Sequence, residues 1–247
     1  MSAEKKYGLI GRNISYSFSK KYFTEKFRLL QLDNHSYDIY ELSEISEIEE
    51  LCREKGLSGF NVTIPYKREI IPYLNSLSEE AVQIGAVNTV VVCGGKTKGY
   101  NTDAAGFEKT LLKLKQENHQ SALILGNGGA AKAVKYVLRS HGIPYVTVYR
   151  KGSLNFDTLT AENVSKHSII IQTTPVGTFP NVHDSVVFPF EALSPEHLVI
   201  DLIYNPPQTA FLSEAAARGS VISNGQLMLE QQAEKAWEIW SSTSDEL

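Results

Sequence analysis

Apolar and polar residues follow two patterns along the chain, one typical of strands and one typical of helices. Residues 7–11 form a short apolar run that predicts a buried strand. The next segment opens with serines and then places Phe23, Phe27 and Leu30 on one helix face. This succession recurs through most of the sequence, so we expect an α/β fold with a mostly parallel sheet.

Three more segments of the first hundred residues carry clear patterns. Residues 35–41 alternate as a second strand. Residues 43–56 have early acids, late bases and a final glycine, the arrangement that a helix favours. Residues 86–103 predict a hairpin that turns at a pair of glycines, followed by a helix that starts near Asp103.

A second succession begins at residue 121. The segment SALILGNGGAAKA predicts a strand, a tight glycine turn and a helix. Further strands and helices follow in YVTVYR, SIIIQTTP, LVIDLIY, TAFLSEAAARG, VIS and LMLEQQAEKAWEIW. We therefore expect two α/β units that join near residue 103.

Composition and charge exclude several classes of protein. Of the 247 residues, 42% are hydrophobic and 21% charged, and the net charge of −4 offers no basic field for nucleic acid or membrane surfaces. No apolar run approaches the roughly 18 residues of a membrane span. The two cysteines and six histidines lack the spacing of metal ligands. We expect a cytoplasmic protein without a metal and without a nucleic-acid or membrane partner.

The glycine turn carries the strongest single motif. Gly126-x-Gly128-x-x-Ala131 satisfies the dinucleotide fingerprint, with alanine in its third place. The first glycine allows a tight turn, the second lets the backbone approach a pyrophosphate, and the alanine lets the helix pack closely. The alternative is a glycine-rich turn that binds nothing.

The following strand favours NADP over NAD. An NAD site usually has an acidic residue about 20 residues after the fingerprint, at the end of the second strand. Here the segment VTVYRKGS offers Arg150 and Lys151 instead, and a guanidinium can bind a 2′-phosphate bidentately. The alternative for Arg150 is an ordinary exposed residue at a strand end.

The stretch GFNVTIPYKREI, residues 59–70, predicts a third strand and then a helix that begins at Pro65, because proline suits the first helical position. Lys67 would then lie in the first turn, where the helix dipole disfavours a cation. Such a lysine suits general acid–base catalysis. A harmless surface lysine is the alternative.

Polar residues gather around Lys67 in the sequence. Asn61 and Thr63 point to one face of the strand before it, and Asn-Thr pairs recur at Asn88 and before Asp103. Two serines, Ser17 and Ser19, lie at a helix start, where hydroxyl and N–H groups can hold a carboxylate. The set suits a small polyhydroxylated acid, although each residue alone is more often a cap or turn residue.

Six motifs in the same order resemble those of the shikimate dehydrogenase (shikimate/quinate dehydrogenase) family over nearly the whole length. NVTIPYK resembles the family's lysine motif, and GAVNT and GYNTD resemble its asparagine and aspartate motifs. GNGGAAKA is similar to its glycine loop. DLIYNPPQTAFL and GQLMLEQQA resemble its late tyrosine and glutamine signatures.

The resemblance implies a role for each matching residue. Lys67 and Asp103 would form the catalytic pair. The substrate would contact Ser17, Ser19, Asn61, Thr63, Lys67, Asn88, Asp103, Tyr204 and Gln232. The cofactor would contact Gly126, Asn127, Gly128, Gly129, Ala130, Arg150, Lys151, Thr174, Gly177 and Gly225.

The resemblance also implies a domain plan. Residues 1–103 with 225–247 would form a discontinuous substrate domain, and residues 104–224 a Rossmann-type NADP-binding domain, with a cleft between them. Two departures stand out. The segment SYSFSK lacks the usual proline after its second serine, and Leu154 occupies the place of a second arginine in the basic motif.

The implied activity is the reversible NADPH-dependent reduction of 3-dehydroshikimate to shikimate, in the shikimate pathway of chorismate and aromatic amino-acid biosynthesis. A monomer or homodimer would act on this small-molecule substrate. Two alternatives remain: a quinate/shikimate dehydrogenase that uses NAD, and a non-catalytic module that binds NADP or a metabolite.

Overall fold

The computed structural model describes residues 4–14 and 17–242, and these form two compact units. The first unit comprises the chain up to Thr102 together with the chain from Ala233 onward, and the second comprises Asp103–Gln232. The contacts thus divide the last helix at residue 232, whereas the sequence-based domain plan divides the chain at 225. The assignment of residues 225–232 to a substrate domain stays a prediction.

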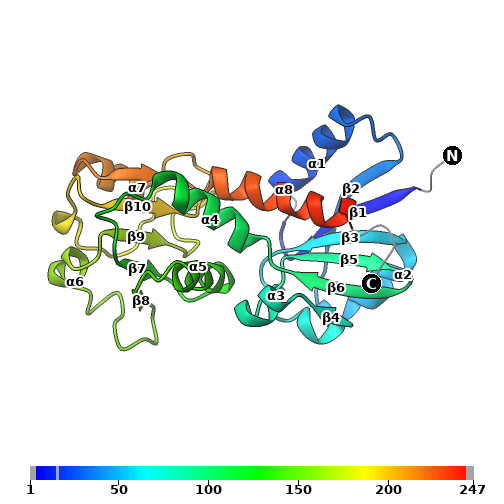
Figure 1. Ribbon diagram of the computed structural model, residues 1–247, viewed down its shortest axis with the longest axis horizontal. Coiled ribbons are helices and arrows are strands. Elements are labelled where there is room, and N and C mark those ends of the chain that lie inside the picture. The colour runs from blue at the N-terminus through cyan, green and yellow to red at the C-terminus, as the bar shows by residue number, and fades with distance from the viewer. Residues whose placement is uncertain (1–3, 15–16, 243–247) are drawn as a thin grey trace. The chain divides into compact units, whose positions relative to one another are not determined.

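The first unit contains a six-stranded sheet in the order β2-β1-β3-β5-β6-β4 (Figure 1). Only β5 runs opposite to its neighbours, because its pairings with β3 and β6 are antiparallel and the other pairings are parallel. The strands are β1 (Lys5–Gly11), β2 (His35–Glu41), β3 (Leu57–Val62), β4 (Ser76–Leu77), β5 (Thr89–Cys93) and β6 (Lys96–Tyr100). The mostly parallel sheet is confirmed, and the short strand β4 is an addition to the sequence pattern.

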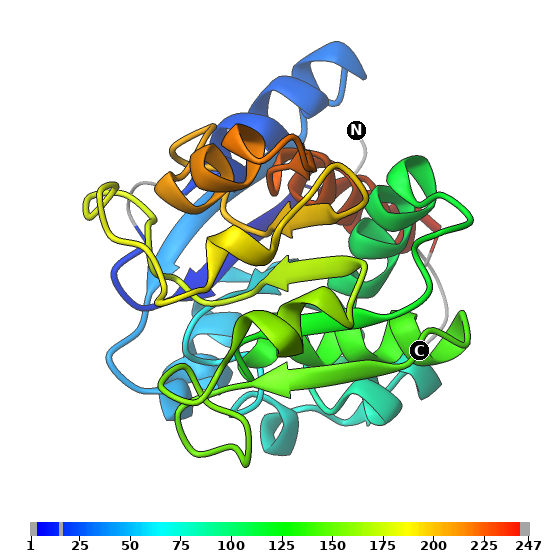
Figure 2. The same cartoon turned by 90° about the vertical axis from the view of Figure 1, so that its left-hand side faces the viewer.

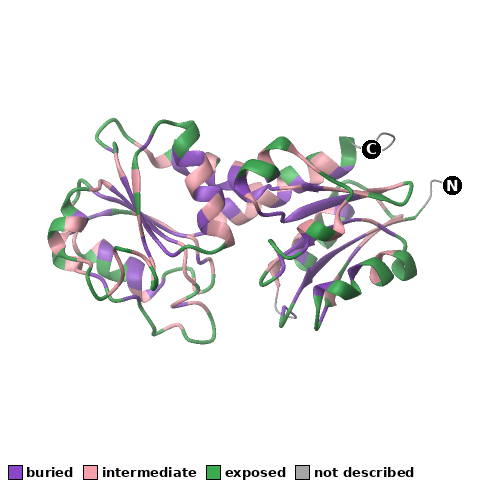
Figure 3. Cartoon of the chain, turned by 90° about the horizontal axis from the view of Figure 1, so that it is seen from below, coloured by how far each residue is buried: buried purple, intermediate pink, exposed green. Residues whose placement is uncertain are grey.

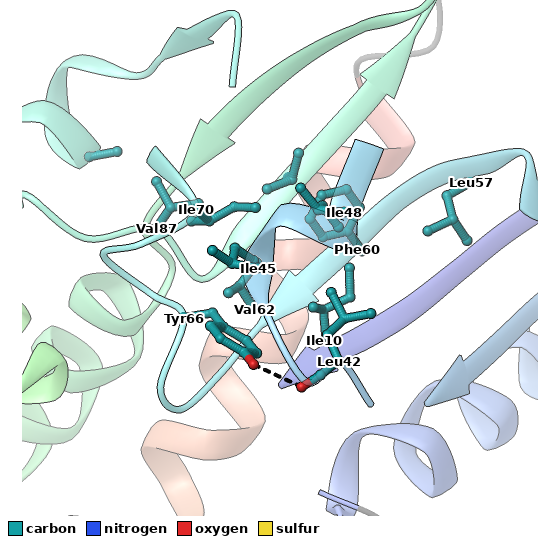
Figure 4. Packing of buried hydrophobic residues seen from close by; sticks show 12 residues of the cluster. Ile10, Leu42, Ile45, Ile48, Leu57, Phe60, Val62, Tyr66, Ile70 and Val87 are labelled. Carbon is teal, nitrogen blue, oxygen red and sulfur yellow. Dashed lines mark hydrogen bonds between the residues drawn. The ribbon is translucent and has the colours of Figure 1, made fainter. Parts of the chain in front are cut away.

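Helices cover both faces of this sheet. On one face, α1 (Phe18–Leu29) and the end of α8 (Gln226–Ser242) pack on β1, β2 and β5, with Phe23, Phe27 and Trp240 buried. On the other face, η1 (Ile45–Glu47), α2 (Ile48–Lys55) and α3 (Glu79–Ile84) enclose a second apolar cluster (Figure 4). Tyr66 belongs to this cluster and donates its hydroxyl proton to the Leu42 carbonyl at 2.8 Å. The sheet is therefore buried on two sides.

The helix expected from Pro65 onward is absent, and that prediction was wrong. Residues 64–70 form successive turns, which lead into the 3₁₀ helix η2 (Ile71–Tyr73). The main-chain carbonyl of Lys67 accepts the N–H of Val87 at 2.7 Å, so it is not used in a helical ladder. The N–H of Ile71 turns instead to Arg68. A bond to another segment thus replaces the local helix.

The predicted hairpin is confirmed. Strands β5 and β6 pair in antiparallel register, and Gly94 and Gly95 form the turn with φ of 56° and 76°. Two successive residues with positive φ are what a tight hairpin turn requires, and glycine adopts them without steric cost. The hairpin carries Asn88 and Thr102 just outside its two ends.

The second unit contains a five-stranded parallel sheet in the order β11-β10-β9-β7-β8 (Figure 2). Its strands are β7 (Ala122–Leu125), β8 (Tyr145–Val148), β9 (Ile169–Gln172), β10 (Leu198–Asp201) and β11 (Val221–Ser223). In chain order this is the 2-1-3-4-5 arrangement of doubly wound nucleotide-binding folds. The expected Rossmann-type topology is confirmed in this broader sense.

The central strands of this sheet are apolar because both faces are covered. Every residue of β7, β9 and β10 is buried (Figure 3). The helices of the unit are α4 (Asp103–Leu114), α5 (Gly129–Ser140), α6 (Ala161–Ser165), α7 (Ala210–Ala217) and the first part of α8, with the short 3₁₀ helix η3 (Phe190–Ala192). Within the described ranges, no helix combines the length and apolar character needed to cross a bilayer.

Candidate active site

In the first unit, Asn61 lies at the centre of a buried polar network. It is the penultimate residue of β3, and its side-chain amide is fully engaged: Oδ1 accepts the hydroxyl proton of Tyr37 at 2.8 Å. Its Nδ2 donates to the Asn88 carbonyl at 3.2 Å and to Thr89 Oγ1 at 3.1 Å. These bonds fix the orientation of the amide.

Asn88 extends the network to the far end of the hairpin. Its Oδ1 accepts the main-chain N–H of Thr102 at 2.7 Å, and its Nδ2 donates to Thr102 Oγ1 at 3.0 Å. Asn88, Thr89 and Thr102 are all buried, so each bond satisfies a polar group that water does not reach. The two Asn-Thr pairs noted in the sequence are therefore partners in space.

Sequence reasoning did not single out Tyr37, which connects this network to the start of α1. Its hydroxyl is hydrogen-bonded to Ser19 as well as to Asn61. Burial raises the pKa of Tyr37, and the bond to Ser19 opposes that rise. The strand pattern predicts that Tyr37 lies in a strand, but only the pairing of β1 with both β2 and β3 brings it near Asn61.

The two predicted serines lie at the start of α1. Ser17 caps the helix, and its Oγ accepts the main-chain N–H of Ser19 at 3.3 Å. Ser19 is buried in the first turn and belongs to the network, whereas Ser17 is half-buried. Thr63 is half-buried just after β3, and its N–H donates to the Ile10 carbonyl at 2.9 Å.

Lys67 reaches this region through its main chain. The Lys67 carbonyl accepts the N–H of Val87, the residue just before Asn88, and this bond holds the turn segment next to the network. The argument from a helix dipole does not apply, because no helix surrounds Lys67. The main chain of the half-buried Lys67 therefore lies next to the segment that leads into β5, where the buried amides and hydroxyls of the network begin.

In the second unit, the glycine loop adopts the conformation that the fingerprint requires. Gly126 has φ of 114°, and a Cβ at that position would lie 2.5 Å from Thr173 Oγ1. At Gly128, which caps α5, a Cβ would meet no atom within 4 Å. The first glycine thus allows a close turn, and the second leaves the helix N-terminus open to an anion.

The loop borders a pocket of about 610 Å³. It lies where the chain order of the strands reverses, between the carboxyl ends of β7 and β9, which is the usual ligand site of open α/β sheets. The lining residues are Gly126, Asn127, Gly128, Tyr149, Arg150, Lys151, Phe156, Thr173, Thr174 and Pro175. Phe156 comes from an irregular loop without sequence periodicity, so sequence reasoning could not place it.

Arg150 and Lys151 come shortly after β8, separated from it by Tyr149, and are exposed at this pocket. Within the part of the chain that the structure describes, neither side chain forms an ion pair. Two cations that no carboxylate neutralises make this wall of the pocket attractive to a phosphate. The pocket fits a dinucleotide with an extra phosphate on its ribose.

The other predicted cofactor residues lie near this sheet edge or at turns. Gly129 and Ala130 begin α5, and the N–H of Thr174 donates to Gln172 Oε1 at 2.6 Å. Gly177 has φ of 94°. Gly225 precedes α8, and a Cβ there would lie 2.1 Å from the Leu202 carbonyl oxygen, so only glycine fits.

The remaining predicted substrate residues, which belong to the second unit, lie in three places. Asp103 is the buried first residue of α4, where the helix dipole favours a carboxylate. Gln232 lies in α8, and its Nε2 donates to the Leu229 carbonyl at 3.0 Å. Tyr204 is half-buried in the loop after β10. The predicted roles of these residues and of those in the first unit stay predictions.

A buried carboxylate anchors the loop that carries Tyr204. Asp201 ends β10, its Oδ2 accepts the hydroxyl proton of Thr209 at 2.7 Å, and its Oδ1 accepts the Ile203 N–H at 3.0 Å. Burial raises the pKa of Asp201 to about 6, although both hydrogen bonds lower it. The loop is therefore closed at its two ends by one side chain.

These features define a class of protein: a two-unit α/β protein with a nucleotide-type pocket in one unit and a buried polar network beside a lysine in the other. Among the described residues, no group of three or more His, Cys, Asp or Glu side chains is placed to hold a metal ion. A family model described as the shikimate dehydrogenase substrate binding domain matches residues 9–90.

Relatives match over almost the whole chain. A shikimate dehydrogenase (NADP(+)) of Staphylococcus epidermidis is 37% identical over 257 residues, which cover 98% of this chain and 94% of the relative. The structure of shikimate dehydrogenase from Aquifex aeolicus superposes with a TM-score of 0.88 at 32% identity, covering 100% of this chain and 96% of that one. This chain belongs to the shikimate dehydrogenase family.

A second similar structure was solved with ligands. Shikimate 5-dehydrogenase from Thermus thermophilus, in complex with NADP(H) and shikimate, superposes with a TM-score of 0.86 at 28% identity. The match covers 98% of this chain and 95% of that one. The shared fold therefore includes both units described above.

Proposed function

We propose that this chain catalyses the reversible reduction of 3-dehydroshikimate to shikimate with NADPH, an oxidoreductase reaction at a CH–OH group. It would thus serve the shikimate pathway of chorismate and aromatic amino-acid biosynthesis. One observation carries the proposal: a chain of this family keeps a switch-point pocket with two unpaired cations at the end of β8. That pocket suits NADP, the cofactor named for the relatives.

The substrate roles are part of the proposal. Ser17 and Ser19 would hold the carboxylate of the substrate, as hydroxyl groups at a helix start can. Lys67 would donate a proton to the alkoxide that forms at C3, and Asp103 would orient the substrate hydroxyl and the lysine. The ring hydroxyls would meet Asn61, Thr63, Asn88, Tyr204 and Gln232.

The network around Asn61 and Asn88 supports these roles. Because Tyr37, Thr89 and Thr102 hold both amides, the orientation of each amide would be fixed before the substrate arrives. Preorganised polar groups avoid the free-energy cost of reorienting during the reaction. The bond from Val87 to the main chain of Lys67 would place the proton donor without engaging its side chain.

The cofactor would lie against the glycine loop. Gly126 and Gly128 would let the backbone approach the pyrophosphate, and Arg150 and Lys151 would bind the 2′-phosphate. Thr174, Gly177 and Gly225 would border the nicotinamide end. NADPH supplies the hydride in the reducing direction, and the protein supplies orientation and the proton.

The proposal includes a cytoplasmic location for a monomer or homodimer. Cys52 and Cys93 are both free thiols, which suits a reducing compartment.

The proposal is tested by the choice of substrate and cofactor. Steady-state rates should be measured for shikimate and quinate, each with NADP⁺ and with NAD⁺. We expect kcat/KM to be highest for shikimate with NADP⁺, by at least about tenfold over either exchange. A preference for quinate with NAD⁺ would favour the other dehydrogenase. Cofactor binding without turnover of either acid would favour a binding module.

A further inference from the structure

Lys135 lies on α5 and reaches back to the glycine loop. Its Nζ donates to Asn127 Oδ1 at 2.6 Å, and Asn127 lines the pocket between the two fingerprint glycines. Side chains on a helix point toward its N-terminus, which explains how a residue in the second turn reaches the loop before the helix. The ammonium group is thus held at the edge of the pocket.

The face of α5 that carries Lys135 is the face next to β8. Arg139 lies one turn later on the same face, and its Nη1 donates to the hydroxyl of Tyr145 at 3.3 Å. Tyr145 begins β8, and that strand runs parallel to β7 toward Arg150. Helix α5 runs antiparallel to the strands of the sheet. Lys135 therefore lies nearer than Arg139 to the carboxyl end of β8.

The charged residues of α5 are all basic. The twelve residues of α5 include Lys132, Lys135 and Arg139 and no acidic residue. The partner of Lys135, an amide oxygen, is neutral and leaves the charge uncompensated. Partial burial lowers the pKa of Lys135, and so do the charges of Arg139 and Lys132. An anion beside Lys135 would relieve that repulsion.

The pyrophosphate and the 2′-phosphate are the two anions that the pocket could receive. The pyrophosphate would be bound by the backbone N–H groups at the N-terminus of α5. Residues at the end of the second strand of such a sheet contact the ribose and its 2′ substituent, and here these residues are Arg150 and Lys151, after β8. Since Lys135 lies on the side of α5 that faces β8, we group it with Arg150 and Lys151. Leu154 has an apolar side chain that packs against the buried cluster of the unit, and it adds no charge.

We infer that Lys135, held by Asn127, is a specificity-determining residue that binds the 2′-phosphate of NADP together with Arg150 and Lys151. This inference rests on the proposed use of NADP. Lys135 on α5 would thus supply a further cation, in place of the second arginine of the basic motif, where this chain has Leu154. A contact between the ammonium group and the 2′-phosphate strengthens the binding of NADP and not of NAD, which lacks that phosphate, so it separates the two cofactors.

Calorimetric titration of the full chain with NADP⁺ and with NAD⁺, without substrate, tests this inference, because the two ligands differ only in the 2′-phosphate. For Lys135→Gln we expect NADP⁺ binding to weaken about tenfold and NAD⁺ binding to change less than about twofold. Lys135→Arg should retain most of the NADP⁺ affinity. Arg139→Gln is the matched control, since it removes the same charge from the same face; it should weaken NADP⁺ binding less than about threefold.

Each outcome decides a different point. If the unaltered chain binds both cofactors equally, the proposed use of NADP fails and the inference fails with it. If the unaltered chain prefers NADP⁺ and Lys135→Gln keeps that preference or weakens both cofactors equally, only the role of Lys135 is wrong. Circular dichroism checks that the variants are folded. Asn127→Ala provides a second variant, and it should weaken NADP⁺ binding more than NAD⁺ binding.

Discussion

Lys67 is positioned by its backbone. The carbonyl that accepts the Val87 N–H belongs to the main chain, so the anchoring of this segment does not depend on the lysine side chain. The neighbouring Tyr66 is fully buried and fixes the same turn from the other side. A side-chain substitution at Lys67 should therefore change chemistry and leave the local fold in place.

For Lys67→Ala we expect kcat to fall by at least about 100-fold while KM changes only a few-fold, because general acid–base groups contribute mainly in the transition state. Steady-state kinetics with shikimate and NADP⁺ measure both parameters. Arg68→Ala, at the exposed cation next in sequence, is the matched control and should keep nearly full kcat. An unchanged kcat for Lys67→Ala would remove this residue from the mechanism.

Asp201 makes the stability of the chain depend on pH. Its pKa is raised from 3.8 to about 6, so between these values the folded state binds more protons than the unfolded state. The free energy of unfolding should therefore fall as pH rises through this window and level off above it. A shift of this size corresponds to about 3 kcal/mol, which is an upper bound for one group.

Asp201→Asn removes that titration and keeps an oxygen for the Ile203 N–H. We expect the free energy of unfolding of the unaltered chain, minus that of the variant, to decrease by up to about 3 kcal/mol between about pH 4 and pH 7. Urea unfolding at several pH values measures it. A difference that does not vary with pH would show that Asp201 does not titrate as described.

Helix α8 makes a close contact with the sheet of the first unit near its C-terminal end. Within the first unit, Trp240 donates its indole N–H to the Val90 carbonyl at 3.0 Å. It fits there because residue 59 is glycine: a Cβ at Gly59 would lie 2.5 Å from the indole nitrogen. The C-terminal end of α8 is thus fastened to the middle of the sheet.

For Trp240→Phe we expect the free energy of unfolding to fall by about 1–3 kcal/mol, because the substitution removes a buried hydrogen bond and leaves a small void. Chemical denaturation measures the loss. Trp237→Phe, at a half-buried position one turn earlier, is the matched control and should cost less. Equal losses at the two positions would mean that the bond to Val90 contributes little.

At the scale of elements, much of the fold could be predicted. Strands such as β7 and β9 carry uninterrupted apolar runs, and glycines with positive φ mark the hairpin and the nucleotide turn. The missing helix after Pro65 could not be predicted, because the competing hydrogen bond comes from Val87 in another segment. Local propensity is a weak guide wherever a tertiary bond takes over a backbone group.

The candidate site follows the same rule. The residues named from motifs include Gly126, Arg150 and Asn88, and the structure places each at a pocket or in a network. Tyr37 and Lys135 belong to no motif, and they enter only through side-chain bonds across elements. Sequence patterns identify chemistry that lies in one segment, whereas partners brought by the fold need the structure.

At the scale of the whole molecule, the two units offer complementary chemistry. The first contains a lysine beside oriented amides and hydroxyls, and the second contains a phosphate-seeking pocket with Arg150 and Lys151. The side chains of either unit alone would not specify a reaction. Together, in a chain that belongs to the shikimate dehydrogenase family, they support hydride transfer between NADP(H) and a small polar acid.

The most direct measurement is the consumption of NADPH in the presence of 3-dehydroshikimate, followed by its near-ultraviolet absorbance. The account predicts that absorbance falls with one equivalent of shikimate formed per NADPH oxidised, and that NADH supports a rate at least about tenfold lower. Omitting 3-dehydroshikimate should abolish the change. No oxidation of either cofactor by the folded chain would contradict the account.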